Sequence, residues 1–188
     1  MSKSILLVGV GGQGTILASK LLTIGLLQAG YDVKMSEIHG MSQRGGNVSS
    51  QIRYGEKVCS PVIEIGGADI IVAFERVEAL RNLQYLKPEG TVVVNDYRID
   101  PMSVLSGAFK YPDDVIETLR SKAKTIVIHA TDAAEKLGNA KVMNIIMLGS
   151  IAKNMQLDEI DWNTIIAQNV KPQFIDLNQK AFALGFES

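Results

Sequence analysis

Gly9-Val10-Gly11-Gly12-Gln13-Gly14 is the stretch that decides the fold of this 188-residue chain. It follows the apolar run over residues 5–8 and leads directly into a long helical stretch, residues 15–29. A strand whose last glycines open a helix is typical of the first βαβ unit of a Rossmann-like fold. Glycine permits the tight turn, and the N-terminus of the helix then directs free N–H groups at the crevice beyond the sheet. The sequence therefore predicts an α/β protein.

A second glycine loop follows the next predicted strand, residues 32–38, and reads Gly40-Met41-Ser42-Gln43-Arg44-Gly45-Gly46-Asn47. In a parallel sheet both loops emerge at the carboxyl edge, where open α/β sheets bind their ligands. Arg44 stands among hydroxyl and amide donors, which suits a carboxylate, a phosphate or an acidic residue of a partner. It suits equally an arginine that supports the loop through backbone carbonyls, so both interpretations stay open.

The rest of the chain alternates short β-rich runs with helical stretches. Strands are predicted over residues 68–74, 91–95 and 125–130, and helices over 75–86, 113–124, 131–137, 142–155, 162–169 and 171–184. Residues 48–54 alternate in polarity, and Gly55-Glu56-Lys57 predicts a hairpin turn into Val58. Thr131-Asp132 is the expected cap of the helix over 131–137. We therefore expect one domain, residues 1–188: a doubly wound, mostly parallel sheet with a small antiparallel insertion and a helical C-terminal tail.

Composition narrows the classes of partner. The chain has 19 basic and 20 acidic residues, and this balance disfavours nucleic acid or an anionic membrane as the main partner. Arg120, Lys122 and Lys124 cluster at a predicted helix end, where cations suit the negative end of the dipole. The first residues form a strand pattern instead of a signal peptide, and no stretch approaches the ~20 apolar residues of a membrane span. We expect a cytoplasmic protein.

Metal and nucleophile chemistry find little support in the sequence. Cys59 is the single cysteine, whereas an iron–sulfur cluster usually takes four. His39 and His129 lack the spacing of a zinc site. His39 is expected to be a structural residue at a strand end, with a proton-donor role as the alternative, and His129 is expected to be a core or strand-end residue. No catalytic residue is predicted on this chain.

One alternative function is the binding of a dinucleotide. Gly9, Gly11 and Gly14 have the spacing of the NAD fingerprint, and Glu37 ends the second strand where an acidic residue would bind the adenosine ribose. Against this, Glu37 leads directly into the loop that contains Arg44, and that loop could crowd an adenosine site. We therefore predict that neither NAD nor FAD binds.

Apolar surface predicts an obligate partner. The helix over residues 15–29 is apolar nearly all round, so we expect it to be covered on more than one side. The C-terminal tail carries Trp162, Phe174, Phe182 and Phe186, and large apolar residues are what permanent interfaces are made of. Alone, the chain is expected to self-associate.

The two glycine loops together resemble the gamma-type domain of the 2-oxoacid:ferredoxin oxidoreductase family, and within it the indolepyruvate type. The matching residues are the first loop and the run Glu37-Ile38-His39-Gly40-Met41-Ser42-Gln43-Arg44-Gly45-Gly46. Later landmarks of the family are also present: Ser60-Pro61, Ile65-Gly66, Ala68-Asp69-Ile70, Ala73-Phe74-Glu75 and Asn95. The resemblance covers nearly the whole chain, and the second loop is its most specific part.

The resemblance implies a role within a larger enzyme. Members of this family decarboxylate a 2-oxoacid on thiamine diphosphate, pass electrons through iron–sulfur clusters to ferredoxin, and release an acyl-CoA. In the indolepyruvate type, thiamine diphosphate, magnesium and the clusters belong to the alpha subunit, so this chain would carry no cofactor and would reach ferredoxin and CoA through that partner. The residues expected to face a ligand or the partner are Gly11, Gly12, Gln13, Gly14, Glu37, His39, Ser42, Gln43, Arg44, Gly45, Gly46 and Asn47.

Overall fold

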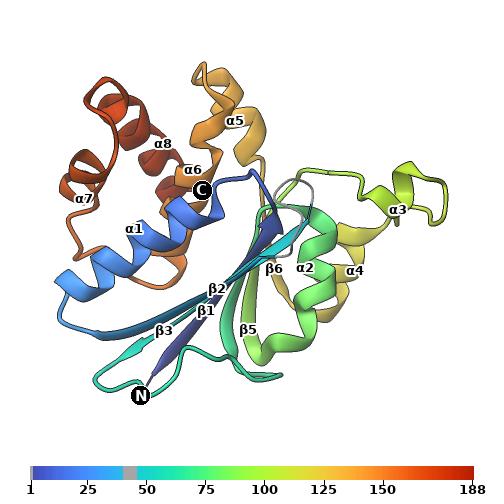
Figure 1. Ribbon diagram of the computed structural model, residues 1–188, viewed down its shortest axis with the longest axis horizontal. Coiled ribbons are helices and arrows are strands. Elements are labelled where there is room, and N and C mark those ends of the chain that lie inside the picture. Colours follow the sequence, from blue (N-terminus) through green and yellow to red (C-terminus); the bar gives the residue numbers. More distant parts are fainter. Residues whose placement is uncertain (1, 40–45) are drawn as a thin grey trace.

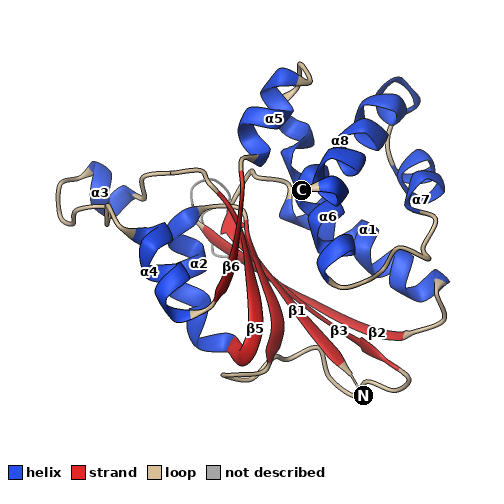
Figure 2. Ribbon diagram, turned by 180° about the vertical axis from the view of Figure 1, so that it is seen from behind, coloured by secondary structure: helices blue, strands red, loops and turns tan. Residues whose placement is uncertain are grey.

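The computed structural model describes residues 2–39 and 46–188, and within them the chain forms a sheet with helices on both faces (Figures 1 and 2). The described sheet has six strands in the order β2-β3-β1-β4-β5-β6. Their bounds are β1 Lys3–Val10, β2 Asp32–His39, β3 Asn47–Gly55, β4 Ala68–Ala73, β5 Leu86–Asn95 and β6 Lys124–Ile128.

Strand directions confirm the predicted mostly parallel sheet with an antiparallel insertion. β1, β4, β5 and β6 are parallel, whereas β3 is antiparallel to both of its neighbours, β1 and β2. Two antiparallel steps restore the direction, so β2 runs the same way as β1. The carboxyl ends of β1 and β2 therefore lie at the same edge of the sheet, as the sequence predicted for the two glycine loops.

The predicted hairpin from residues 55–57 into Val58 is wrong. β3 ends at Gly55, and residues 56–67 contain no strand. The physical reason is that β1 and β2 already occupy both edges of β3, which leaves no edge for a returning strand. Side chains hold this segment instead: Asp32 accepts the N–H of Val58 at 2.8 Å, and Gln51 accepts the N–H of Ile63 at 2.7 Å.

Helices cover the two faces of the sheet unequally (Figure 2). One face carries α1 (Thr15–Gln28), α5 (Ala130–Lys136), α6 (Met143–Asn154), α7 (Trp162–Asn169) and α8 (Ile175–Glu187), and the other carries α2 (Arg76–Asn82) and α4 (Val115–Lys122). A further short helix, α3 (Met102–Leu105), lies between β5 and α4, where neither a helix nor a strand was predicted. The predicted helical C-terminal tail is confirmed.

Two element boundaries differ from expectation for identifiable reasons. The strand predicted over residues 91–95 begins earlier, because β5 starts at Leu86 and its pairing with β4 shifts register over these added residues, as at a β-bulge. The expected cap Thr131-Asp132 lies inside the first turn of α5. The side chain of Asn95, at the end of β5, accepts the N–H groups of Ala130 and Thr131 at 3.0 and 3.3 Å and so satisfies the start of this helix from outside.

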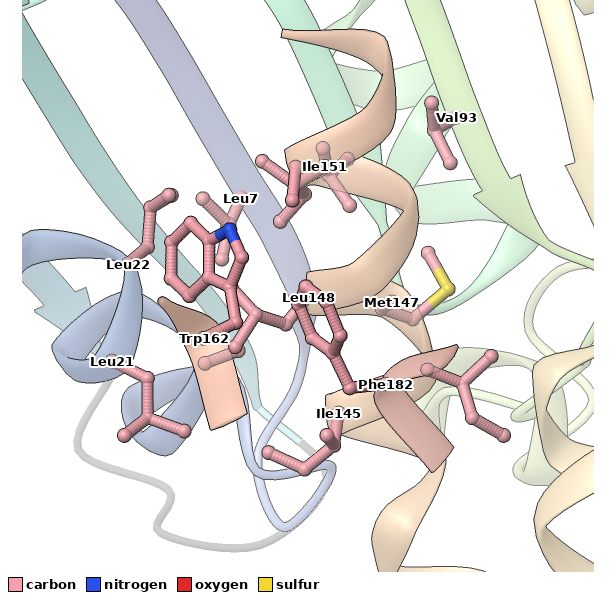
Figure 3. Packing of buried hydrophobic residues seen from close by; sticks show 14 of the residues in the cluster. Leu7, Leu21, Leu22, Val93, Ile145, Met147, Leu148, Ile151, Trp162 and Phe182 are labelled. Carbon is pink, nitrogen blue, oxygen red and sulfur yellow. The ribbon is translucent and has the colours of Figure 1, made fainter. Parts of the chain in front are cut away.

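The larger of two hydrophobic clusters fills the face beneath α1 and α6 (Figure 3). Trp162 and Phe182 are buried there and stack on each other, with ring centroids 5.6 Å apart. These two aromatic residues therefore belong to the core of the chain itself and do not supply the interface for which they were proposed, whereas Phe174 is exposed. The expectation that α1 is covered on more than one side is confirmed, since the helix packs on the sheet and also contacts α6 and α7.

Candidate functional site

The glycine turn after β1 is fixed by its own glutamine. The Oε1 atom of Gln13 accepts the N–H of Val10, and its Nε2 atom donates to the carbonyl of Phe74 just beyond β4, each at 2.8 Å. Gly12 and Gly14 have positive φ angles of 103° and 77°, which residues other than glycine rarely adopt. The Gln13 amide folds back against Gly9. A Cβ at this position would lie 2.9 Å from the Oε1 atom of Gln13, so the contact requires glycine.

Helix α1 begins at this turn without a side-chain cap. Gly14 occupies the N-cap position, and no acidic residue lies in the first turn. The carbonyl of Gly14 accepts the side-chain N–H of the buried Asn144, at the start of α6, at 3.1 Å. Helix α6 thus supports the turn from behind, while the start of α1 lies at the carboxyl edge.

The second glycine loop connects β2 to β3. Four of the predicted site residues, Ser42, Gln43, Arg44 and Gly45, lie outside the described residues, and their ligand- or partner-facing role stays a prediction. The end of the loop is described: the N–H of Gly11 donates to the carbonyl of Gly46 at 2.8 Å, and Asn47 pairs with Val10 in the sheet. The structure therefore brings the first loop into direct contact with the end of the second.

Glu37 and His39 lie on the strand that leads into the second loop. The Oε1 atom of Glu37 accepts the hydroxyl proton of Ser19, a fully buried residue of α1, at 2.8 Å. His39 is exposed at the end of β2, which agrees with its expected place at a strand end. In the described structure the Glu37 carboxylate is thus engaged against α1 and is separated from β1 by the width of β3.

Two amides close the edge of the sheet between β1, β4 and β5. Besides Gln13, the fully buried Asn95 donates to the carbonyl of Phe74, at 3.2 Å, and also to the hydroxyl of Thr131 at 2.9 Å. One carbonyl therefore receives two side-chain amides from opposite sides. Sequence reasoning noted Asn95 only as a strand end, and its position directly at the end of a buried strand is the signal that could have identified this role.

A charged cleft of about 300 Å³ lies at the same edge on the other face. Asp96, directly after β5, binds Arg76 at 2.5 Å (Oδ1 to Nε), and its Oδ2 atom lies 3.6 Å from Nδ1 of His129. Arg120 and Glu117 of α4 also line the cleft. His129 lies at a strand end as expected, but Arg76 and Asp96 were not predicted, although each follows a strand at this edge.

Glu75 fixes the segment that leaves β5. Its buried carboxylate caps α2 by accepting the N–H of Glu78 at 3.0 Å, and it also accepts the N–H of Ile99 at 3.3 Å and the hydroxyl of Tyr111 at 2.5 Å. Burial raises the pKa of Tyr111 above its ordinary value, and the hydrogen bond to Glu75 raises it further. Burial also raises the pKa of Glu78, against the neighbouring Arg81.

Metal and membrane features can be judged for the described residues. Over residues 2–39 and 46–188, no group of three or more His, Cys, Asp and Glu side chains is placed to hold a metal ion. Cys59 is a free thiol on the surface. Within the same ranges, none of the helices combines the length and apolar character that crossing a membrane requires.

Comparison with known proteins identifies the family. The family model described as "Pyruvate ferredoxin/flavodoxin oxidoreductase" matches residues 4–188. The chain therefore belongs to this family of oxidoreductases, and the predicted resemblance to the gamma-type domain is confirmed.

Curated relatives refine the resemblance. The chain is 37% identical to the indolepyruvate oxidoreductase subunit IorB of Thermococcus kodakarensis, over 98% of this chain and 95% of that protein. It is 27% identical to the pyruvate/ketoisovalerate oxidoreductases common subunit gamma of Pyrococcus abyssi, over 95% of this chain and 92% of that one. The similarity to the indolepyruvate type, predicted from the second loop, is thereby confirmed.

Solved structures show the same fold. The pyruvate oxidoreductase subunit PORC of Thermotoga maritima superposes with a TM-score of 0.75 at 23% identity, over all of this chain and 96% of that one. The 2-oxoglutarate:ferredoxin oxidoreductase of Magnetococcus marinus superposes with a TM-score of 0.74 at 17% identity, over 99% of this chain and 30% of that longer chain. At these identities the likeness concerns the fold alone.

Proposed function

We propose that this chain is the cofactor-free gamma-type subunit of a cytoplasmic 2-oxoacid:ferredoxin oxidoreductase of the indolepyruvate type. The complete enzyme would oxidatively decarboxylate an arylpyruvate such as indolepyruvate to an acyl-CoA and reduce ferredoxin. The observation that carries this proposal is the full-length identity of 37% to an indolepyruvate oxidoreductase subunit, against 27% to a subunit of the pyruvate and ketoisovalerate enzymes.

The proposed division of labour places the redox chemistry on the partner. A single cysteine cannot supply the usual four ligands of an iron–sulfur cluster, and the sequence has no Gly-Asp-Gly run of the kind that binds a diphosphate with magnesium. Thiamine diphosphate, magnesium and the clusters are therefore assigned to the alpha subunit. When bound there, thiamine diphosphate supplies the electron sink for decarboxylation.

This chain would contribute the walls of a substrate or CoA site through its two glycine loops. The contact between Gly11 and Gly46 joins the loops at the carboxyl edge, and the Gln13 amide fixes the first of them. Arg44 is the residue proposed to bind a carboxylate, a phosphate or an acidic group of the partner, because its planar guanidinium can bind two oxygens at once.

A dinucleotide-binding module is the alternative, and the geometry disfavours it. In a dinucleotide-binding βαβ unit the acidic residue lies on the strand next to β1, whereas here β3 separates β2 from β1 by a further ~4.8 Å. The Glu37 carboxylate is also bound by Ser19. Calorimetric titration of the isolated chain with NAD and FAD should therefore show no saturable binding, and micromolar affinity for either would favour this alternative.

The proposed function is tested by reconstitution. The chain is co-expressed with the cluster-bearing subunit of its host, and reduction of ferredoxin or a viologen is followed with indolepyruvate, phenylpyruvate, pyruvate and 2-oxoglutarate. We expect CoA-dependent reduction with the highest kcat/KM for an arylpyruvate, and little turnover by either subunit alone. Equal turnover without this chain, or a preference for pyruvate, would contradict the proposal.

A further inference from the structure

An arm of the chain, residues 97–112, projects beyond the sheet between β5 and α4 (Figures 1 and 2). It contains α3, and three of its apolar side chains are exposed to solvent: Met102 by 74%, Leu105 by 65% and Phe109 by 72%. Single exposed apolar residues are normal on a protein surface. Three of them within eight residues concentrate apolar surface on one projecting segment, and concentrated exposed apolar surface marks interaction sites.

The arm is held in one shape by contacts at its base. The buried carboxylate of Glu75 binds both of its ends, through the N–H of Ile99 and the hydroxyl of Tyr111. The guanidinium of Arg98 lies 4.2 Å from the centroid of the Tyr111 ring. Within the arm, the N–H of Phe109 donates to the carbonyl of Ser103 at 3.0 Å. A surface that is ordered before binding loses less conformational entropy when it docks.

We infer that this arm anchors the chain to the larger, cluster-bearing subunit, with Met102, Leu105 and Phe109 inserted into an apolar groove of that partner. The inference rests on the proposed function, since it names the surface through which the proposed partner is bound. The arm leaves the sheet at the carboxyl end of β5, the edge that also carries the two glycine loops. A partner seated on the arm would therefore lie next to this edge.

A second copy of the chain is a poorer occupant, for two reasons. Three side chains of this size offer roughly 400 Å², about half of the ~800 Å² that each partner contributes to a stable interface, so a twofold pair of arms alone would bury too little. Also, neither of two clefts in the described part of the chain is a suitable receptor for the arm of a second copy. The cleft of about 270 Å³ lies between the arm and α2 and is lined mostly by the arm, Phe109 included. The cleft of about 300 Å³ contains five charged side chains among its ten lining residues.

The test measures the affinity of the chain for its co-expressed cluster-bearing subunit by biolayer interferometry. Phe109→Ser and the double variant Leu105→Ser/Phe109→Ser are compared with Ile65→Ser as the matched control. Ile65 is exposed by 72%, the same fraction as Phe109, but it lies before β4 at the opposite edge of the sheet. We expect Phe109→Ser to weaken binding about 10-fold or more and the double variant about 30-fold or more, as for buried anchor residues, and Ile65→Ser to leave the affinity within about twofold.

Two further measurements make the result independent of misfolding. Because the substituted side chains are exposed, the melting temperature of each isolated variant should stay within about 2 °C of the wild type. In the unaltered protein, amide hydrogen exchange across residues 101–109 should slow by about tenfold or more on assembly, because docking suppresses the local opening of the arm through which its amides exchange.

Each outcome decides between the possibilities. If the wild-type chain assembles and turns over substrate, but the arm variants bind normally and the arm amides gain no protection, the inference is wrong while the proposed function stands. If the wild-type chain neither assembles nor supports turnover, both fail. A dimeric isolated chain that becomes monomeric on Phe109→Ser would show that the occupant is a second copy, and this would also overturn the inference.

Discussion

Replacing Gly185 with alanine should destabilise the chain at the contact between α6 and α8. A Cβ added at Gly185 would lie 1.8 Å from the carbonyl oxygen of Ile146, about 1.5 Å short of ordinary van der Waals contact. The opposing glycine, Gly149, is similarly confined, since its Cβ would lie 2.2 Å from the carbonyl oxygen of Phe182. The obstacles are backbone atoms of a neighbouring helix, so no side-chain rotation can make room, and the two helices must separate.

The expected magnitude follows from what that separation exposes. α8 carries Ala181 and Phe182, both buried in the larger cluster, and Phe182 stacks on Trp162. Overpacking a well-packed core costs about 1–3 kcal/mol of unfolding free energy. Because the added methyl group here meets backbone atoms, which cannot rotate away, we expect a loss of about 3 kcal/mol or more. For a domain of this size, that corresponds to a decrease in melting temperature of about 6–12 °C.

The assay is thermal and urea unfolding, with Ala183→Gly as the control. Ala183 is an exposed residue of the same helix, and its change to glycine should cost no more than about 1 kcal/mol, the difference in helix propensity. Propensity alone predicts that Gly185→Ala stabilises α8 by about the same amount. A Gly185→Ala variant as stable as the wild type, or more stable, would therefore refute the close approach of α6 and α8.

Four further predictions concern the carboxyl edge and its base. Gln13→Ala should lower the free energy of unfolding by about 1–3 kcal/mol in urea titration, because it leaves the N–H of Val10 without its partner and removes one of the two donors to the carbonyl of Phe74. An unchanged midpoint would contradict this. The pKa of Tyr111 is raised in the folded state, so its phenol contributes fully to stability below the ordinary value of 10, and this contribution is lost as pH rises above that value. Tyr111→Phe should therefore reduce the decrease of the unfolding free energy with pH between about 9.5 and 11. The pKa of Glu78 is also raised in the folded state, so folding favours its protonated form and the stability falls as pH rises above the ordinary value of 4.5. Glu78→Gln should remove this fall of stability with pH. A variant much less stable than the wild type at pH 7 would contradict the prediction. Arg44→Lys should impair turnover of the assembled enzyme nearly as much as Arg44→Ala, about 10- to 100-fold, without lowering the melting temperature of the free chain, because lysine keeps the charge but loses the bidentate geometry; a variant that melts much lower yet turns over normally would assign Arg44 a structural role.

The start of the fold could be predicted from the sequence because its signals are local. Helix α1 begins at Thr15 as expected, and Gly30 adopts a φ angle of 86° just after its end, which is the conformation for which glycine is selected. Helix α7 has the predicted bounds. The family resemblance depended on short runs of residues in the two loops, and such runs can be recognised without any knowledge of tertiary contacts.

Strand order could not be predicted in the same way. The alternation of residues 48–54 shows a strand, but it does not say whether the strand lies at an edge or between two others. Its two-sided pairing depends on contacts with β1 and β2, up to about fifty residues away in sequence. The same limit applies to the site: that Gln13 can donate and accept was clear from its chemistry, whereas its partner Phe74 is 61 residues distant.

The bonding of the carboxyl edge supports the proposal that this chain acts as a subunit beside a partner that carries the cofactors. Where a dinucleotide-binding fold leaves a crevice, this chain fills the edge above β1, β4 and β5 with its own amides, since Gln13 and Asn95 both donate to the carbonyl of Phe74. Glu37, which could bind a ribose, is bound by Ser19 instead. A polar group in one of these hydrogen bonds is not available to a ligand, and each bond makes the edge more rigid. A rigid edge fixes the points where the two loops begin and end, and this is what the proposed role requires of a subunit that presents both loops to a site completed by its partner.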